Sequence, residues 1–129
     1  MSQLVLDAKT TCCFAGYRPH KYGFKLCDDN PEFNELQENI ISAVEKSYED
    51  GYRTFLCGGA MGFDLLCAEH VLKLKQNHPD IKLICMLPFE DQAKRFSKLW
   101  LEKYNTVLKE CDNIEYITPT YIHGCYFAR

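Results

Sequence analysis

Apolar residues along the chain fall into two kinds of segment, short continuous runs and longer stretches with a period near four. The short runs cover residues 11–15, 54–57, 81–87 and 114–118. Runs of this length and composition predict strands of a buried, parallel sheet. The periodic stretches cover residues 31–50, 63–76 and about 93–111. They predict three amphipathic helices between the strands. The strand–helix alternation favours a three-layer Rossmann-like α/β sandwich with a mostly parallel sheet of about four strands.

Local signals set the ends of these elements. Residues 1–10 have no clear period and predict a loose lead-in to a first, central strand. Asn30-Pro31 is typical of an N-cap followed by the first helical residue, and Gly51 of a helix C-terminus. His70 lies on the apolar stripe of the second helix, which predicts a packed core histidine.

Four segments with candidate chemistry come directly after predicted strands. They are Gly16-Tyr17-Arg18, Gly58 to Gly62, Pro88-Phe89, and residues 121–126 with His123. In a parallel α/β sheet, ligands bind beyond the carboxyl ends of the strands, where these loops meet. We therefore expect the four segments to surround one ligand site.

The loop Gly58-Gly59-Ala60-Met61-Gly62 joins a strand to a helix. Glycines let the backbone approach a ligand, and the N–H groups and dipole of the new helix favour an anion. The spacing is neither a dinucleotide fingerprint nor a P-loop, so a tight turn without a ligand is the alternative. Pro19 favours an extended Arg18, which could pair with a phosphate or could be a solvated loop residue.

Two carboxylates follow the glycine loop. Asp64 lies in the first helical turn, where it stabilises the helix dipole and could accept hydrogen bonds from a sugar hydroxyl. Glu69 is five residues further and roughly 140° around the helix, so the two carboxylates need not converge. They are the weak candidates for catalysis, since no cysteine or serine nucleophile can be matched with a base.

Composition narrows the class of protein. The chain has 129 residues, enough for one domain with a real core, and a net charge of −3 that makes nucleic acid an unlikely partner. No apolar run approaches the ~20 residues of a membrane span, and no signal peptide is evident, so we expect a cytoplasmic location. The eight cysteines include no C-x-x-C pair, which favours reduced cysteines in the core over disulfides or a metal site.

Four motifs, in order and at the expected spacing, resemble the YpsA family of the SLOG superfamily. They are Cys-Cys-Phe-Ala-Gly-Tyr-Arg-Pro from Cys12, Cys-Gly-Gly-Ala-Met-Gly-Phe-Asp from Cys57, Leu-Pro-Phe-Glu-Asp-Gln-Ala from Leu87, and His-Gly-Cys-Tyr-Phe-Ala-Arg from His123. The resemblance implies a Rossmann-like domain that binds a nucleotide or an ADP-ribose-like derivative, in bacterial stress or cell-division physiology. By the same resemblance, Gly16 and Arg18 match the G-x-R turn, and Gly58, Gly59, Gly62 and Asp64 match the glycine loop.

The chain departs from the family pattern in two places. Tyr17 stands where relatives usually carry histidine, and the chain ends at Arg129, where relatives continue with a helix, a fifth strand and a second glycine-rich loop. We expect a shortened copy that lacks the C-terminal strand and forms a homo-oligomer through its exposed edge. The resemblance favours a binding or sensing module without a certain cofactor. The alternatives are an N-glycosidic hydrolase of nucleoside monophosphates and a degenerate protein-interaction module.

Overall fold

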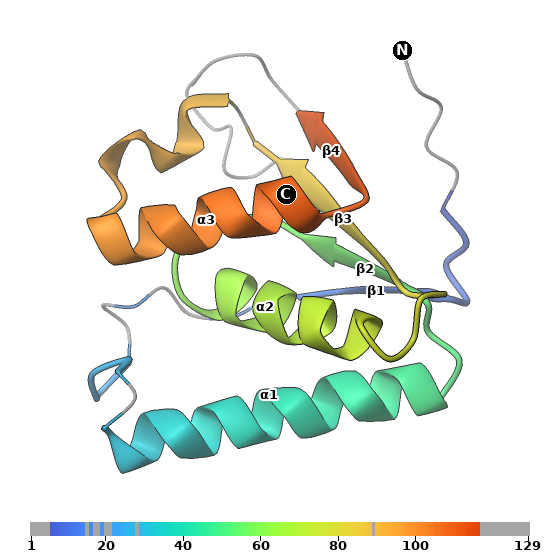
Figure 1. Cartoon of the computed structure of the whole chain (residues 1–129), viewed down its shortest axis with the longest axis horizontal. Helices are drawn as coiled ribbons and strands as arrows, with labels where there is room; N and C mark the ends of the chain where they lie inside the picture. Colours follow the sequence, from blue (N-terminus) through green and yellow to red (C-terminus); the bar gives the residue numbers. More distant parts are fainter. Residues whose placement is uncertain are drawn as a thin grey trace.

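A computed structural model of the chain describes residues 6–14, 16, 19, 22–27, 29–88 and 90–116. Strands and helices alternate as the sequence pattern predicts (Figure 1). In chain order they are β1 (Thr11–Cys13), α1 (Pro31–Glu49), β2 (Thr54–Cys57), α2 (Phe63–Lys75), β3 (Lys82–Leu87), the 3-10 helix η2 (Glu90–Arg95), α3 (Lys98–Glu110) and β4 (Asn113–Tyr116).

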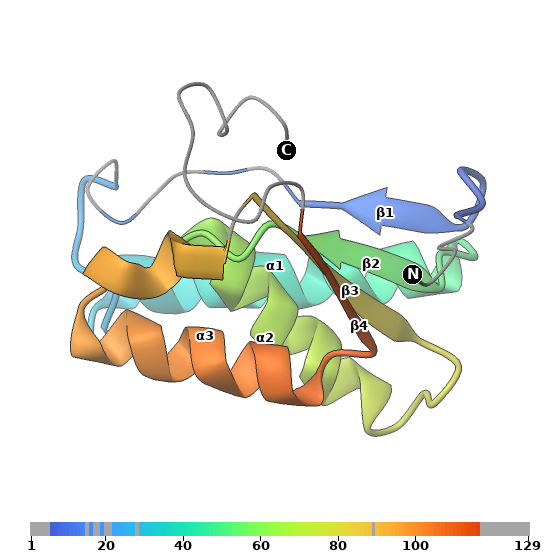
Figure 2. The same ribbon diagram turned by 90° about the horizontal axis from the view of Figure 1, so that it is seen from above.

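The strands form one parallel sheet in the order β1-β2-β3-β4, which confirms the predicted α/β class. Each right-handed crossover moves one strand further in the same direction, so all three α-helices pack on one face of the sheet (Figure 2). The part of the chain that the structure describes thus supplies two layers of the expected sandwich. For the same reason β1 is an edge strand among the described strands, and its predicted central place is wrong within this set.

The core lies between this helical layer and the sheet. Alternate strand residues point into it, including Phe55 of β2 and Leu83 and Leu87 of β3, which have no exposed surface. Helix α2 packs between α1 and α3 (Figure 1), so it is buried where it faces these two helices as well as where it faces the sheet. Its buried residues are Asp64, Leu65, Leu66, Cys67, Ala68, His70 and Val71.

The opposite face of the sheet carries the other alternate residues. Ile84 is buried there, Leu56 and Met86 are half-buried, and Cys13 is exposed. The expectation that the cysteines in apolar segments are core residues therefore holds for Cys57, Cys67 and Cys85, but it is wrong for Cys13. The reason is the two-residue period of a strand, which places adjacent Cys12 and Cys13 on opposite faces.

Two further sequence predictions, on the ends of helices, can be compared with the structure. Asn30 is the N-cap of α1, its side chain accepting from the N–H groups of Glu32 and Phe33, and Gly51 has a φ of 105° at the other end. The single long helix expected from about residue 93 is instead η2 followed by α3. The chain is extended at Ser97, which is the N-cap of α3 and separates the two helices. Within the described residues, no helix is long and apolar enough to cross a membrane.

Polar side chains join the elements at the amino ends of the strands. Arg53 precedes β2, and its Nε lies 2.9 Å from the carboxylate of Asp80, which precedes β3. The guanidinium also covers the Tyr48 ring at 3.9 Å, and the Tyr48 hydroxyl donates to Asp80. Asp112, which precedes β4, pairs with Lys75 of α2 and accepts from the N–H of Leu83.

Candidate ligand site at the carboxyl edge of the sheet

The turn from β2 to α2 is built on two glycines with positive φ. Gly59 has a φ of 74° and Gly62 a φ of 94°, a region of backbone space that glycine enters without steric cost. Gly62 is the N-cap of α2, and no side chain caps the helix there. The first hydrogen bond of the helix runs from the N–H of Leu66 to the carbonyl of Gly62. The N–H groups of the first turn therefore lie outside the helix's own ladder, at its positive end.

Two side chains fix the path of this glycine loop. The thiol of Cys57 accepts from the N–H of Gly59 at 3.3 Å and donates to the carbonyl of Asp64 at 3.5 Å. It thereby joins the end of β2, the loop and the first turn of α2. Gln92, in η2, donates from its amide Nε2 to the carbonyl of Gly58 at 3.1 Å. The loop after β2 is thus tied to the segment after β3.

Gly59 packs too closely for any side chain. A Cβ there would lie 2.7 Å from Leu87 Cδ2, 2.9 Å from Gln92 Nε2 and 3.2 Å from Tyr104 Cε1. Both Gln92 and Tyr104 are buried, and Gln92 Oε1 and the Tyr104 hydroxyl have no hydrogen-bond partner among the residues that the structure describes. Burial raises the pKa of the Tyr104 hydroxyl, which keeps it neutral. The glycine at residue 59 therefore serves packing, whatever else the loop does.

Gly16 brings the segment after β1 to the same place. A Cβ on Gly16 would lie 2.3 Å from the Phe63 ring, and Phe63 is the first residue of α2. Segments that follow β1, β2 and β3 therefore meet around the start of α2, as expected for the carboxyl edge of a parallel sheet. Of the other predicted ligand residues, Ala60 and Pro88 are buried in these segments, whereas Tyr17, Arg18, Phe89 and His123 lie outside the described residues.

The two carboxylate candidates are separated as the helix geometry predicts. Asp64 is buried in the first turn of α2, with 8% of its surface exposed, beside the glycine loop. The carboxylate of Glu69 forms an ion pair with Lys103 of α3 at 3.0 Å, with about a quarter of each side chain exposed. Glu69 therefore joins two helices, and only Asp64 lies at the loop.

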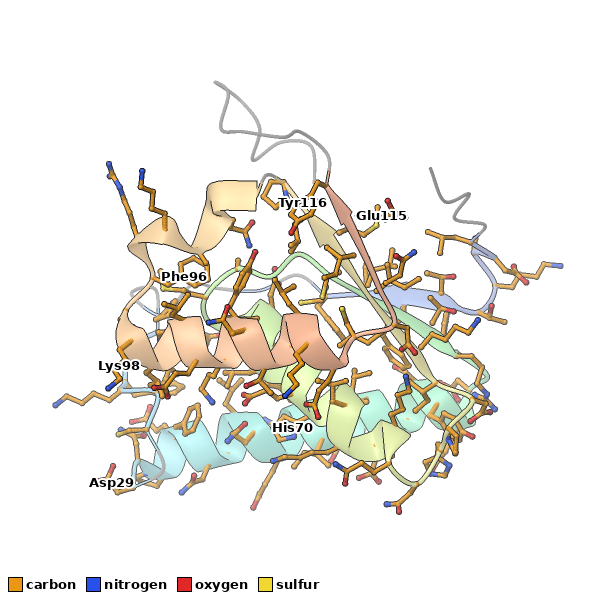
Figure 3. The ribbon with its side chains drawn as sticks, turned by 45° about the horizontal axis from the view of Figure 1, so that its top comes forward. Asp29, His70, Phe96, Lys98, Glu115 and Tyr116 are labelled. Atoms are coloured by element: carbon orange, nitrogen blue, oxygen red, sulfur yellow. The ribbon has the colours of Figure 1, made fainter. Side chains whose placement is uncertain are left out.

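His70 is a packed core histidine, as predicted. It lies between α1 and α2 (Figure 3), where its Nε2 is 2.6 Å from Gln37 Oε1 of α1. Burial lowers its pKa, so the ring is neutral at physiological pH. This contact fixes the spacing of the two helices and leaves His70 away from the glycine loop.

A separate apolar cleft of about 260 Å³ runs beneath β1. Its described lining comes from β1 and the residue after it, from β2, and from α1 and α2: Cys12, Cys13, Phe14, Ile40, Ala43, Val44, Ser47, Phe55, Phe63 and Cys67. Ser47 is the one hydroxyl among these residues, and none of them is charged. It lacks the donors that a phosphate needs, so the glycine loop is the better candidate for an anion.

The sequence analysis did not assign a role to Cys57 or to Gln92. Their signals were available, since Cys57 directly precedes the glycine pair and Gln92 lies in the Leu-Pro-Phe-Glu-Asp-Gln-Ala motif. Sulfur and amide contacts to a loop backbone depend on rotamers, which periodicity does not reveal. Among the described side chains, no group of three His, Cys, Asp or Glu residues is placed to hold a metal ion.

A protein-family model decides the relationship. The YpsA model, described as "YspA SLOG family", matches residues 12–128. The chain belongs to the YpsA family. This confirms the resemblance, and with it the interpretation of the four motifs as family motifs.

The curated relatives of the YpsA-family chain are bacterial UPF0398 proteins. The protein from Halalkalibacterium halodurans is 30% identical over 109 residues, 84% of this chain and 57% of the relative. The protein from Bacillus pumilus is 31% identical over 104 residues, 80% of this chain and 55% of the relative. The protein from Staphylococcus epidermidis is 33% identical over 99 residues, 77% of this chain and 53% of the relative. The chain thus spans about half the length of the curated relatives it matches.

Proposed function

We propose that the chain binds a phosphate-bearing, nucleotide-derived molecule of the ADP-ribose type at the carboxyl edge of its sheet. The observation that carries this proposal is the start of α2. Gly62 caps the helix without a side chain, and the first-turn N–H groups lie at the edge where three post-strand segments meet. A helix start of this kind favours an anion by hydrogen bonding and by its dipole.

Two further features support a ligand at this edge. Gln92 Oε1 and the Tyr104 hydroxyl are buried without a partner behind Gly59, and unpaired buried polar groups are uncommon away from functional sites. Membership of the YpsA family adds the ligand class, because the SLOG resemblance implies nucleotide derivatives. Asp64, buried beside the loop, has the chemistry to accept from a ribose hydroxyl.

A thermal-shift titration with ADP-ribose, NAD, AMP and ATP tests the proposal. A ligand at 100-fold its dissociation constant adds ~2.7 kcal/mol, which raises the melting temperature of a domain of this size by roughly 10 °C. Met61, half-buried between Ala60 and Gly62, offers a matched pair of variants. Met61→Asp places a negative charge at the loop and should abolish the shift, while the similarly shaped Met61→Asn should keep it.

Gly59→Asp is unsuitable for this test because its side chain would displace Leu87 and Gln92. Arg18→Ala tests the phosphate role that the G-x-R resemblance implies for Arg18. No shift with any of the four ligands, or an equal shift in Met61→Asp and Met61→Asn, would contradict the proposal.

The hydrolase alternative has less support from the geometry. Glu69, one of its two candidate carboxylates, is paired with Lys103 of α3. Only Asp64 is placed beside a prospective ligand. Release of free adenine from AMP by the wild-type chain, and its loss in Asp64→Asn, would favour the hydrolase over the binding module.

Self-association is a second proposal, which rests on the open edges of the described sheet. β1 and β4 each have one neighbour in that sheet, and unpaired strand edges tend to recruit further strands. We expect light scattering at micromolar concentration to give the mass of a dimer or larger assembly. A monomeric mass would contradict pairing, and it would favour the nucleotide sensor over the protein-interaction module.

A further inference from the structure

Three cysteine thiols lie side by side on the core face of the sheet. Cys57 of β2 and Cys85 of β3 are direct neighbours in the parallel register, and Cys111 lies between α3 and β4. Cys85 is in the middle: Cys57 is its neighbour in the register, and the thiols of Cys57 and Cys111 both act on it. Sulfur atoms, drawn in yellow, are visible between α3 and the sheet in Figure 3. All three cysteines are free.

Access to solvent differs sharply along this row. Cys57 and Cys85 are 1% and 0% exposed, whereas Cys111 is half-buried at the turn into β4. The Cys111 thiol lies 3.3 Å from the carbonyl of Leu108 and 3.5 Å from that of Asn113. An oxidant in solution therefore meets Cys111 before Cys85, which has no exposed surface.

The electrostatics favour the same order of reaction. The hydrogen bond from Cys85 lowers the pKa of the Cys111 thiol, and burial and the neighbouring Asp112 act in the opposite direction. The pKa of Cys85 is raised by its hydrogen bonds to Cys111 and Cys57 and by burial. A thiolate is the reactive form of cysteine, so Cys111 should react with the oxidant first. Cys85 should then react with the oxidised Cys111.

We propose that Cys111 and Cys85 form a peroxide-sensitive disulfide pair. The Cys111 thiolate attacks one oxygen of hydrogen peroxide, the O–O bond breaks, and hydroxide leaves as water after taking a proton. The Cys85 sulfur then attacks the sulfur of the resulting sulfenic acid, the S–O bond breaks, and a second water carries away the Cys85 proton. Two thiols lose two electrons in total, and one peroxide is reduced to two waters.

The pair is connected to the glycine loop through Cys57. That thiol contacts Cys85 on one side and binds Gly59 and Asp64 on the other. Oxidation of Cys85 therefore removes a hydrogen-bond partner from the residue that fixes the loop. The proposal itself stands on the three thiols and does not depend on the proposed ligand.

Other thiols in the described part of the chain fit this chemistry less well. Cys27 lies 2.9 Å from a carboxylate oxygen of Asp29, and that hydrogen bond raises its pKa. Burial raises the pKa of both Cys12 and Cys67. These cysteines are held as thiols, so they should react more slowly with peroxide than Cys111.

The test is controlled oxidation of the reduced 129-residue chain with hydrogen peroxide, followed by intact-mass analysis and peptide mapping. We expect a loss of two hydrogens, about 2 Da, and a cross-link that joins the peptides of Cys85 and Cys111. A cross-link between any other two cysteines as the first product, or oxidation of Cys111 slower than that of exposed Cys13, would overturn the proposal.

Three variants sharpen the result. Cys111→Ser removes one of the two sulfurs, so the loss of about 2 Da and the cross-link to Cys85 should both be absent. Cys85→Ala should stop the reaction at a sulfenic acid on Cys111, a gain of about 16 Da that dimedone traps. Cys13→Ser removes an exposed thiol outside the row and should behave as wild type. If Cys85→Ala does not fold, the cross-link map of the wild-type chain alone decides between confirmation and rejection.

Discussion

The two ends of the sheet are held together in different ways. At the amino end, charged and aromatic side chains connect the elements. Arg53 pairs with Asp80 and covers the Tyr48 ring, and Asp112 pairs with Lys75. At the carboxyl end, the described contacts are made by backbone groups, a thiol and an amide. There the loop after β2 is held by Cys57 and Gln92, and two buried polar atoms have no partner in the described part of the chain.

This difference concerns how the polar groups are paired. At the amino end, Arg53 is paired with Asp80 and Lys75 with Asp112. At the carboxyl end, no described side chain caps the N-terminus of α2, and two buried polar atoms have no partner among the described residues. Ligands of parallel α/β sheets bind at this edge, which is where the proposed site lies. The predictions below compare the two ends.

The largest effect should come from filling the space at Gly59. Gly59→Ala forces a Cβ into Leu87 and Gln92 at a φ of 74°, whereas Gly51→Ala at the amino end has a φ of 105° and nothing within 4 Å. Both variants carry backbone strain of roughly 1–2 kcal/mol, and only the first adds overpacking of about 1–3 kcal/mol. In urea unfolding, Gly59→Ala should therefore be less stable than Gly51→Ala by the overpacking contribution of about 1–3 kcal/mol. Equal losses would mean that the loop relaxes freely.

The second comparison concerns the charge at Asp112. Its Oδ2 accepts from the buried N–H of Leu83 at 2.8 Å, and its Oδ1 pairs with Lys75. Asp112→Ala leaves that N–H without a partner and should cost about 1–3 kcal/mol in the free energy of unfolding. Asp112→Asn keeps an acceptor and removes the charge, so it should lose less than half as much. If the two variants lose equal stability, the ion pair and not the hydrogen bond holds this turn.

The third comparison uses two buried cysteines of α2 and β2. Cys57→Ala removes two hydrogen bonds to the glycine loop, while Cys67→Ala removes a similar volume of buried sulfur from the core. We expect Cys57→Ala to be less stable by a further ~1 kcal/mol in urea unfolding, the usual net value of a hydrogen bond. It should also weaken ligand binding, which Cys67→Ala should leave unchanged. Identical behaviour of the two variants would show that the thiol does not position the loop.

The same contrast explains how far the sequence could be interpreted. The element order, the caps at Asn30 and Gly51, and the packed His70 follow from periodicity and local propensity, and the structure confirms them. The break at Ser97 does not appear in the pattern because Ala93 of η2 and Trp100 of α3 belong to the same core cluster, so the apolar period continues across the break. Phe96 (labelled in Figure 3), whose ring meets that of Tyr104 edge-on at 5.4 Å, belongs to that misleading pattern.

The candidate site was predicted in outline and not in detail. The glycine loop and its place at the carboxyl edge follow from spacing and from the rule for parallel sheets. That Gly59 is required for packing, and that Cys57 and Gln92 hold the loop, depends on contacts between residues far apart in the chain. Sequence patterns record which face a residue occupies, but they do not record which atoms it meets there.

The smallest effect should be a change in pH dependence at the amino end. The Tyr48 hydroxyl donates to Asp80 and is the main cause of a lowered pKa for that carboxyl group. The unfolded chain then binds a proton more readily than the folded one, so stability rises with pH. The contribution is fully present above the ordinary Asp pKa of about 3.9 and is lost as the pH falls through the lower folded value.

Tyr48→Phe removes this donor while keeping the ring against Arg53. The Asp80 pKa should move back toward its ordinary value, so the variant should be slightly less stable than wild type near pH 7. As the pH falls through the lowered folded pKa of wild-type Asp80, that carboxyl group becomes protonated in both proteins, and their urea midpoints should converge. A stability difference that stays constant from neutral to acid pH would place the role of Tyr48 in ring packing alone. In that case the Tyr48 ring and Arg53 would stabilise the amino end by packing. The two ends of the sheet would then differ in how their side chains pack more than in how their charges are paired.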